Sequence, residues 1–357
     1  MDAPPRTALA LGVPHGSQPD VAAFAAALPK VELHLHLVGS ASIETIRALA
    51  LRHPNGGVPT ELAALRRYYE FTDFAHFLNV YHDVNLLVCT SVDVITLLDG
   101  LAAELAARTV RYAEVQVTPV RSRMAGISYD DLAQALVEGR ELARARHGVE
   151  LGWIFDADAM LGPQGAAETV DFAVDYRLAG TVGLGLGGPE VDVRRSDFAP
   201  VFRHARDAGL HSLPHAGETV GPAEMWAAVT ELGAERIGHG IGSAGDPQLL
   251  ELLASRDIAL EVCPSSNVAT GAVASLPEHP LPALLAAGVP VTLAADDPGM
   301  FHNDLVTEYR LCHEVFGLGV HELANIARTG VRAAFCSPEL RATILAEIDT
   351  CEWKAAP

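Results

Sequence analysis

The stretch "VELHLHLVGS", residues 31–40, gives the first indication of the fold. Its apolar and polar residues alternate as in a β-strand, in which residues two apart point to the same side. His34 and His36 therefore share one face, and the polar series stops at Val38. Burying two imidazoles is costly unless a partner satisfies them, and a divalent metal is a common partner of neutral imidazole. The stretch predicts a strand that presents two metal ligands.

Seven further short apolar runs, rich in β-branched residues, follow along the chain, and most precede a helical pattern. With the first, at 30–37, they occupy residues 110–119, 150–157, 180–188, 210–218, 236–242, 258–266 and 290–298. From the second run on, the spacing is roughly 20–40 residues, the length of a βα unit. Eight repeats of strand and helix predict an α/β fold of the closed (β/α)8 TIM-barrel type.

The length of 357 residues allows one large barrel domain. We expect this domain to span residues 26–357, after a flexible tail at 1–25. Residues 41–109 carry helical patterns, which predict an insertion after strand 1, on the face where barrel enzymes place their active sites. Phe71, Phe74 and Phe77 lie at helical spacing in this insertion and could either pack its core or line a pocket.

The composition narrows the class of protein. A net charge of −20 disfavours binding to nucleic acid, because the two polyanions repel each other. Five scattered cysteines without CxxC spacing do not resemble a disulfide framework and favour a reducing, cytoplasmic location. The apolar run near the N-terminus is too short and too interrupted to predict a signal or membrane segment.

Residues that can carry chemistry recur where other predicted strands end. "HAGE" places His215 and Glu218 after the fifth run, and "RIGHG" places His239 after the sixth. "AADDP" places Asp296 and Asp297 after the eighth run. Catalytic groups of barrel enzymes gather at the carboxyl ends of the strands. One HxH pair alone is weak evidence, but four matching strand ends together indicate a metal site.

The motifs "LPKVELHLHLVGS", "HAGE", "RIGHG", "CPSSN" and "LAADDP" resemble those of the adenosine deaminase family of the amidohydrolase superfamily, and span residues 28–298 in the family's order. The resemblance implies a (β/α)8 barrel that holds one Zn²⁺ per chain, with His34, His36, His215 and Asp296 as metal ligands. Binuclear relatives commonly use a bridging lysine on the fourth strand. The only lysines here are residues 30 and 354, so a single metal is favoured.

The resemblance also implies the roles of the remaining site residues. A zinc ion would activate a water molecule to attack the ring carbon that carries the exocyclic amine. Glu218 would protonate the neighbouring ring nitrogen, and His239 would orient the water or take its proton. Asp297 would bind the purine near N7, or else be a rim carboxylate that caps the next helix. Gly188 would let the backbone approach N3.

Two departures from the family pattern bear on the substrate. Members that act on adenosine typically carry aspartate at the position of Val38, where it resembles a ligand for the ribose 5′-hydroxyl. They often carry an acid at the position of Gly185, so its loss predicts a roomier pocket. The preferred substrate would be a 5′-modified adenine nucleoside. We favour aminodeoxyfutalosine, an intermediate of the futalosine route to menaquinone, whose carboxylate Arg121 or Arg123 could bind.

Other functions remain open on the sequence. Adenosine, 5′-methylthioadenosine or adenine could be the substrate instead. A catalytically silent nucleoside-binding homologue and a metal-dependent hydrolase of phosphoesters or lactones are candidates from other classes. The oligomeric state is not indicated by any pattern in the chain.

Five further polar residues are expected to be structural. Two histidines should be packed or loop residues, one cysteine a small buried hydrophobe, and a Ser-Asn pair should order a loop at the barrel mouth. In the same order, these are His211, His302, Cys263, Ser266 and Asn267.

Overall fold

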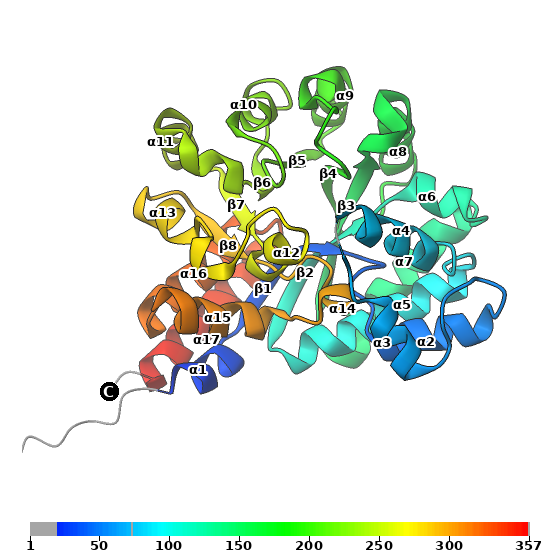
Figure 1. Cartoon of the computed structure of the whole chain (residues 1–357), viewed down its shortest axis with the longest axis horizontal. Helices are drawn as coiled ribbons and strands as arrows, with labels where there is room; N and C mark the ends of the chain where they lie inside the picture. Colours follow the sequence, from blue (N-terminus) through cyan, green and yellow to red (C-terminus); the bar gives the residue numbers. More distant parts are fainter. Residues whose placement is uncertain (1–19, 73, 356–357) are drawn as a thin grey trace, which may run out of the picture.

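Eight parallel strands, hydrogen-bonded in chain order, surround the centre of this computed structural model, which describes residues 20–72 and 74–355 (Figure 1). The strands are β1 Lys30–His36, β2 Val110–Val117, β3 Glu150–Asp158, β4 Thr181–Gly187, β5 His211–Ala216, β6 Arg236–His239, β7 Ala259–Val262 and β8 Val291–Leu293. Each lies within a run expected to be a strand or extends it by one residue. The prediction of a (β/α)8 barrel is therefore confirmed.

The barrel closes where the chain after β8 meets β1. A parallel bridge pairs Leu35 with Asp296, whose N–H donates to the His34 carbonyl at 3.2 Å. The N–H of His36 in turn donates to the Asp296 carbonyl at 3.3 Å. The expected strand at 290–298 is shortened to three residues, because the backbone leaves β8 and turns at Asp296. Closure thus brings an aspartate beside the histidine strand.

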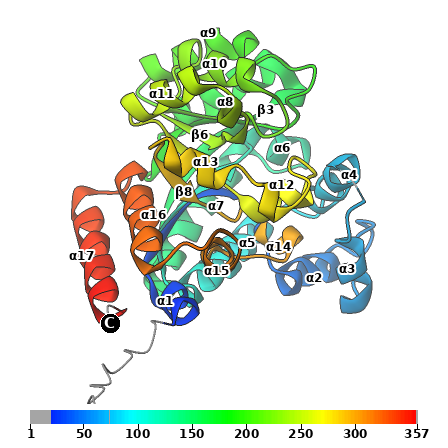
Figure 2. The same ribbon diagram turned by 60° about the vertical axis from the view of Figure 1, so that its left-hand side comes forward.

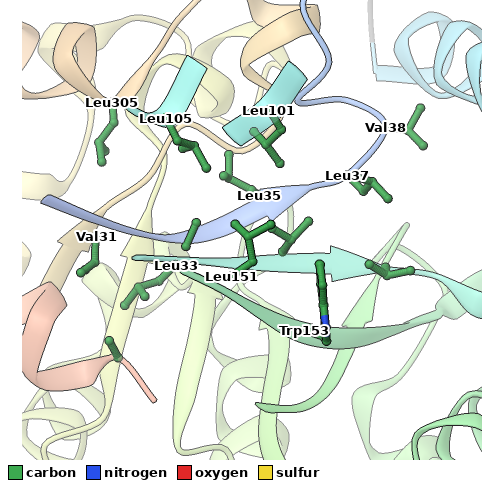
Figure 3. Packing of buried hydrophobic residues seen from close by; sticks show 14 of the residues in the cluster. Val31, Leu33, Leu35, Leu37, Val38, Leu101, Leu105, Leu151, Trp153 and Leu305 are labelled. Atoms are coloured by element: carbon green, nitrogen blue, oxygen red, sulfur yellow. The ribbon is translucent and has the colours of Figure 1, made fainter. Parts of the chain in front are cut away.

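Strand β1 is buried on both sides, as a barrel strand must be. Its apolar residues Val31, Leu33 and Leu35 belong to the main hydrophobic cluster. Figure 3 shows Leu101 and Leu105 of the surrounding helical layer on the side of β1 that carries Leu35. The alternate residues Glu32, His34 and His36 contact groups across the barrel interior: the Ala295 N–H after β8, Glu261 of β7 and His215 of β5, respectively. The period of two therefore separates core packing from the site.

Helices surround the strands (Figures 1 and 2). The α-helices are α1 Val21–Ala27, α2 Ile43–Arg52, α3 Leu62–Tyr68, α4 Phe74–Asn85, α5 Ser91–Ala107, α6 Pro119–Met124, α7 Tyr129–Leu142, α8 Gly162–Tyr176, α9 Ala199–Asp207, α10 Pro222–Thr230, α11 Pro247–Ser255, α12 Pro264–Ala269, α13 Leu281–Ala286, α14 Pro298–Phe301, α15 Leu305–Phe316, α16 Val320–Ala333 and α17 Pro338–Ala355. Short helices are the π-helical η1 Ala143–His147 and the 3-10 turns η2 Ala159–Leu161, η3 Arg195–Phe198, η4 Ile241–Gly245 and η5 Leu276–Glu278.

The expected insertion at 41–109 is helical, comprising α2 to α5. Helix α5 packs against β2 and α7, so it serves as the covering helix of the first βα unit. The side chains of Phe71 and Phe77 lie with ring centroids 5.3 Å apart, and Phe77 lies 5.0 Å from Phe301 of α14. These rings therefore pack the insertion against the segment after β8. The side chain of Phe74 falls outside the described part of the structure.

The expected tail at 1–25 is too long, because Val21–Ala27 form helix α1. Asp20 caps its first turn by accepting from the Ala23 N–H at 3.0 Å. The ammonium of Lys30, fully buried, donates to the carbonyls of Ala25 and Leu28 at the end of the helix. A buried ammonium needs such acceptors, so α1 is fastened to the barrel. Residues 1–19 lie outside the described residues.

Within residues 20–72 and 74–355, no helix is both long enough and apolar enough to cross a membrane.

Candidate active site

Four side chains from three parts of the barrel point ligand atoms at a common space. His36 Nε2 lies 3.2 Å from His215 Nε2 and 3.3 Å from Asp296 Oδ1. His34 Nε2 lies 3.5 Å from the same Asp296 oxygen. Ligand atoms placed about 2.0–2.1 Å from a tetrahedral ion would lie about 3.3–3.4 Å from one another. Three pairs among the four predicted ligands therefore have separations expected of atoms bound to one metal ion, and the three histidines form one candidate metal cluster.

Hydrogen bonding also fits a metal at this position. His34 Nε2 and Asp296 Oδ1 are both buried and have no hydrogen-bond partner among the described residues. Orphaned buried polar atoms are costly, and a cation between them would satisfy both. Two imidazoles, a third from β5 and a carboxylate form a donor set that suits Zn²⁺.

A buried chain of charges orients the first histidine. His34 Nδ1 lies 2.6 Å from Glu261 Oε2 on β7, which fixes the ring's proton on Nδ1 and leaves Nε2 free to bind a metal. Arg236 of β6 bonds the other oxygen of Glu261 and also Glu114 of β2. The sequence interpretation missed these three residues. The available signal was a charged residue inside each of three apolar runs.

Two residues of the site adopt backbone conformations that are unusual outside glycine. His239 has φ +58° and Asp296 has φ +65°, in the left-handed region. Such strain persists only where the surroundings hold it, and it is frequent at functional sites. Here Ser266 donates to Asp296 Oδ2 at 2.6 Å, and Asn267 Nδ2 lies 3.1 Å from His239 Nδ1. The expected loop residues Ser266 and Asn267 therefore also hold site residues directly.

The expected proton donor lies beside the ligand cluster. Glu218 Oε2 lies 3.7 Å from His239 Nε2, and its Oε1 accepts from the Thr270 hydroxyl at 3.2 Å. Burial, reinforced by the charge of Asp296, raises the pKa of Glu218 to about 8. Burial lowers the pKa of His239 to about 3, so its ring is neutral at physiological pH. A protonated acid and a neutral imidazole thus face the same space.

Asp297 turns a second carboxyl toward the site. It is only 4% exposed, and its Oδ1 has no hydrogen-bond partner within the described part of the chain. Burial and the neighbouring Asp296 raise its pKa to about 8. Gly39 makes room for it, because a Cβ at Gly39 would lie 1.6 Å from Asp297 Oδ1. Although its backbone does precede α14, its side chain makes no cap hydrogen bond there.

Two glycines, one within β4 and one just after it, bear on the shape of the pocket. Gly188 has φ +90°, a conformation that favours glycine and leaves its backbone open to close approach. The loss of an acid at Gly185 does not enlarge the pocket as predicted. A Cβ there would lie 2.4 Å from Oδ1 of Asp156 on β3, which is 4% exposed. A carboxyl from the neighbouring strand therefore fills the vacated space, and burial raises its pKa to about 7.

Val38 lies past the end of β1 (Figure 3) and lines a small cavity of about 30 Å³. Arg121 of α6, Tyr81 of α4 and Gln116 of β2 line the same cavity. Arg121 forms an ion pair with Asp158 at 2.6 Å. The buried Oε1 of Gln116 has no hydrogen-bond partner among the described residues. The cavity therefore combines an apolar wall with the guanidinium of Arg121 and the unpaired amide oxygen of Gln116.

Arg123 is placed differently from Arg121. It is half-exposed, pairs with Glu168 at 2.7 Å and contacts the Tyr129 hydroxyl. Among the described residues, the Val38 cavity is lined by none of Arg123, Glu168 and Tyr129. Arg121, unlike Arg123, therefore lines the cavity beside Val38.

His211, His302 and Cys263 have surroundings that agree with the structural roles expected of them. His211 stacks on Phe335 with ring centroids 3.7 Å apart, at the start of β5. His302 follows α14 near the ring of Tyr69. Cys263 is fully buried, its thiol donates to the Glu261 carbonyl at 3.4 Å, and burial raises its pKa.

Comparison with known proteins defines the class. The family model described as adenosine deaminase matches residues 29–351. The chain belongs to the adenosine deaminase family, within the amidohydrolase superfamily. It is a hydrolase that acts on carbon–nitrogen bonds of cyclic amidines.

Individual relatives sharpen the comparison. The chain is 49% identical over 333 residues to the aminodeoxyfutalosine deaminase of Streptomyces coelicolor, covering 93% of this chain and 86% of that protein. A solved adenine deaminase from Arthrobacter aurescens is 31% identical, with a TM-score of 0.87, covering 92% of this chain and all of that one. A zinc-bound amidohydrolase from Burkholderia ambifaria is 26% identical, with a TM-score of 0.86 and 97% of each chain covered.

Proposed function

We propose that this protein removes the 6-amino group of aminodeoxyfutalosine by hydrolysis and releases ammonia. The observation that carries the proposal is the ligand cluster of three histidines and Asp296, with Glu218 and His239 beside it. The substrate is supported by the 49% identity to the Streptomyces coelicolor enzyme and by valine at position 38. Five free cysteines support a reducing, cytoplasmic setting for this activity.

One Zn²⁺ per chain, held by His34, His36, His215 and Asp296, would supply an activated water molecule. Glu218 donates its proton to purine N1 while water adds at C6, since burial keeps this acid protonated near neutral pH. His239 accepts from Asn267 at Nδ1, so its neutral ring carries a proton on Nε2 and orients the water. One proton of the added water restores the Glu218 acid, and the other passes to the C6 amine. The C6–N bond then breaks, ammonia leaves, and C6 keeps the oxygen as a carbonyl.

The purine is held by groups matched to its nitrogens. N7 of a purine is an acceptor, so it needs a donor rather than a carboxylate. Asp297, with a pKa raised to about 8, is protonated at neutral pH and can donate to N7. The backbone of Gly188 donates to N3 at the opposite edge of the ring. Both contacts recognise adenine in any nucleoside and leave the 5′ substituent to other residues.

The 5′ substituent is selected at the Val38 cavity. Valine cannot pair with a 5′-hydroxyl, and leaving that hydroxyl desolvated costs about 1–3 kcal/mol. Aminodeoxyfutalosine instead carries a benzoate-bearing arm at the 5′ position. Its aryl ring would meet the apolar side chains first, and its carboxylate would then meet Arg121, which can bind it in place of Asp158. The present volume of about 30 Å³ is too small for an aryl group. The side chains that line the cavity must therefore move apart before an aryl group can enter.

The test is a comparison of kcat/KM on aminodeoxyfutalosine, 5′-methylthioadenosine, 5′-deoxyadenosine, adenosine and adenine, with zinc measured per chain. We expect aminodeoxyfutalosine to be preferred and about one zinc to be bound. A clear preference for adenosine or adenine would overturn the substrate assignment but keep the deaminase. Tight nucleoside binding without ammonia release would instead indicate a silent homologue, and turnover of esters alone would indicate another hydrolase.

A further inference from the structure

Three consecutive backbone N–H groups in the loop after β5 converge on one carboxylate. Oε1 of Glu190 accepts from the Gly217 N–H at 2.6 Å. Oε2 accepts from the N–H of Glu218 at 2.9 Å and from that of Thr219 at 2.7 Å. The Thr219 hydroxyl adds a fourth contact at 3.2 Å. The loop that carries the proposed proton donor is therefore wrapped around the side chain of another glutamate.

The conformation of this loop depends on an anion at its centre. Gly217 has φ +70°, and a Cβ there would lie 2.7 Å from Met225. Successive N–H groups that point inward form a concavity that binds anions. Glu190 is 4% exposed, so water cannot readily replace its oxygens. Without the carboxylate, one buried and two partly buried N–H donors would lose their acceptor, and the loop would rearrange to find others.

Arg195 connects Glu190 to the strand that carries a metal ligand. It is fully buried, and its Nε donates to the His215 carbonyl at 2.9 Å. Its Nη2 lies 3.7 Å from Glu190 Oε1. Its backbone N–H donates to Glu224 of α10 at 2.7 Å. The buried Arg195 therefore contacts both the backbone of the proposed metal ligand His215 and the carboxylate that holds the loop.

We propose that Glu190 is a positioning residue for the deamination, which holds the backbone of Glu218 so that its carboxyl reaches the substrate ring. This deepens the proposed function and rests on Glu218 being the proton donor. Glu190 stands two residues after Gly188, the proposed contact to purine N3. A single segment after β4 would therefore fix both the position of the purine, through Gly188, and that of the acid Glu218, through Glu190. Misplacing a reacting group by about 1 Å can reduce the rate about 100-fold.

The test compares Glu190→Gln with the matched variant Glu224→Gln. Glutamine keeps the shape of Glu190 but turns an NH2 group toward N–H donors, so part of the loop must move away. Glu224 accepts from the N–H of the same Arg195 but, among the described residues, makes no hydrogen bond or ion pair with residues 217–219. We expect Glu190→Gln to lower kcat about 10- to 100-fold, with KM within about threefold and zinc content unchanged. Glu224→Gln should stay within about threefold of wild type.

Hydrogen exchange provides a readout that does not require turnover. The amides of residues 217–219 should exchange at least about tenfold faster in zinc-loaded Glu190→Gln than in wild type. If the wild type deaminates no aminopurine, the proposed function fails, whereas the exchange result still tests the loop. Unchanged kcat and unchanged exchange in Glu190→Gln would overturn the positioning role. An equal loss of kcat in Glu224→Gln would also overturn it, since it would reflect general destabilisation.

A second variant covers the case in which Glu190→Gln does not fold. Glu190→Asp keeps the charge and both oxygens but draws them back by about 1.5 Å, the length of one carbon–carbon bond. We expect it to lose at least about tenfold in kcat while retaining zinc. Wild-type kcat in folded Glu190→Asp would show that the distance to the loop does not matter and would overturn the proposal.

Discussion

His34 Nδ1 lies 2.6 Å from Glu261 Oε2, so the first barrel strand is tied to the seventh at a metal ligand. Neither group is more than 4% exposed, and Arg236 compensates the charge of Glu261 on its other side. The ring of His34 is therefore fixed before any metal arrives. Pre-oriented ligands bind metals more tightly than mobile ones.

Glu261→Gln should weaken zinc binding about 10- to 100-fold. The amide oxygen is neutral, so it holds the Nδ1–H of His34 less strongly than a carboxylate does. Competition with a chelator would measure this change. Glu114→Gln is the matched control, since Glu114 bonds the same Arg236 but not His34. Equal zinc affinities in the two variants would contradict the orienting role.

The activity should depend on pH through Glu218. Its pKa is raised to about 8, first by burial and then by Asp296, so the donating acid is present below that value. We expect kcat/KM to fall as the pH rises above neutrality. A bound cation would lower the pKa of Glu218, so the fall would then begin at a lower pH. Glu218→Gln should reduce kcat about 10²- to 10⁴-fold below pH 8, where the wild-type acid is protonated, and the difference should shrink at higher pH. An activity that increases steadily through pH 8 and above would be inconsistent with this role.

The same shift has a consequence for stability. Because the folded pKa of Glu218 exceeds its ordinary value, the native state binds more protons than the unfolded state between these values. Stability should therefore decline as the pH rises from about 4.5 to about 8. Metal-free Glu218→Gln avoids this loss, and we expect its Tm to exceed that of the wild type by a few degrees at pH 8. The gain should vanish near pH 4; a Tm below that of wild type at pH 8 would refute it.

Val38→Asp should shift selectivity toward adenosine. A charge-assisted hydrogen bond to the 5′-hydroxyl contributes about 1.5–3 kcal/mol, so kcat/KM on adenosine should rise about 10- to 100-fold. Activity on aminodeoxyfutalosine should fall, because the new carboxylate repels that of the substrate. Val38→Ala, which removes bulk without adding an acceptor, serves as the control. A similar gain on adenosine in both variants would attribute the effect to space alone.

Gly39→Ala should impair catalysis through Asp297. The added Cβ would lie 1.6 Å from Asp297 Oδ1, so the acid must leave its present position. We expect KM to increase about tenfold or more with zinc retained, since the three atoms nearest to the added Cβ all belong to Asp297. Gly245→Ala is the control, because no described atom lies within 4 Å of a Cβ there. Kinetics that match those of the control would remove Asp297 from purine binding.

Much of the site could be predicted from sequence because its signals are local. The period of two in β1 puts His34 and His36 on one face, and short motifs at strand ends supply His215, Glu218, His239 and Asp296. In a parallel barrel all carboxyl ends of strands meet at one face, so these motifs needed only the fold class to be brought together. Their contacts in the structure agree with that expectation.

The supporting contacts depend on which strands become neighbours and how the barrel closes. Glu261 reaches His34 across 227 residues, and Glu190 reaches the loop of Glu218 from the adjacent strand's end. Asp156 occupies the space beside Gly185, which the chain pattern alone suggested was empty. Sequence periodicity assigns a side chain to a face but not to a partner on another strand. Register and closure choose those partners, so only the tertiary structure decided which charges orient the ligands and the acid.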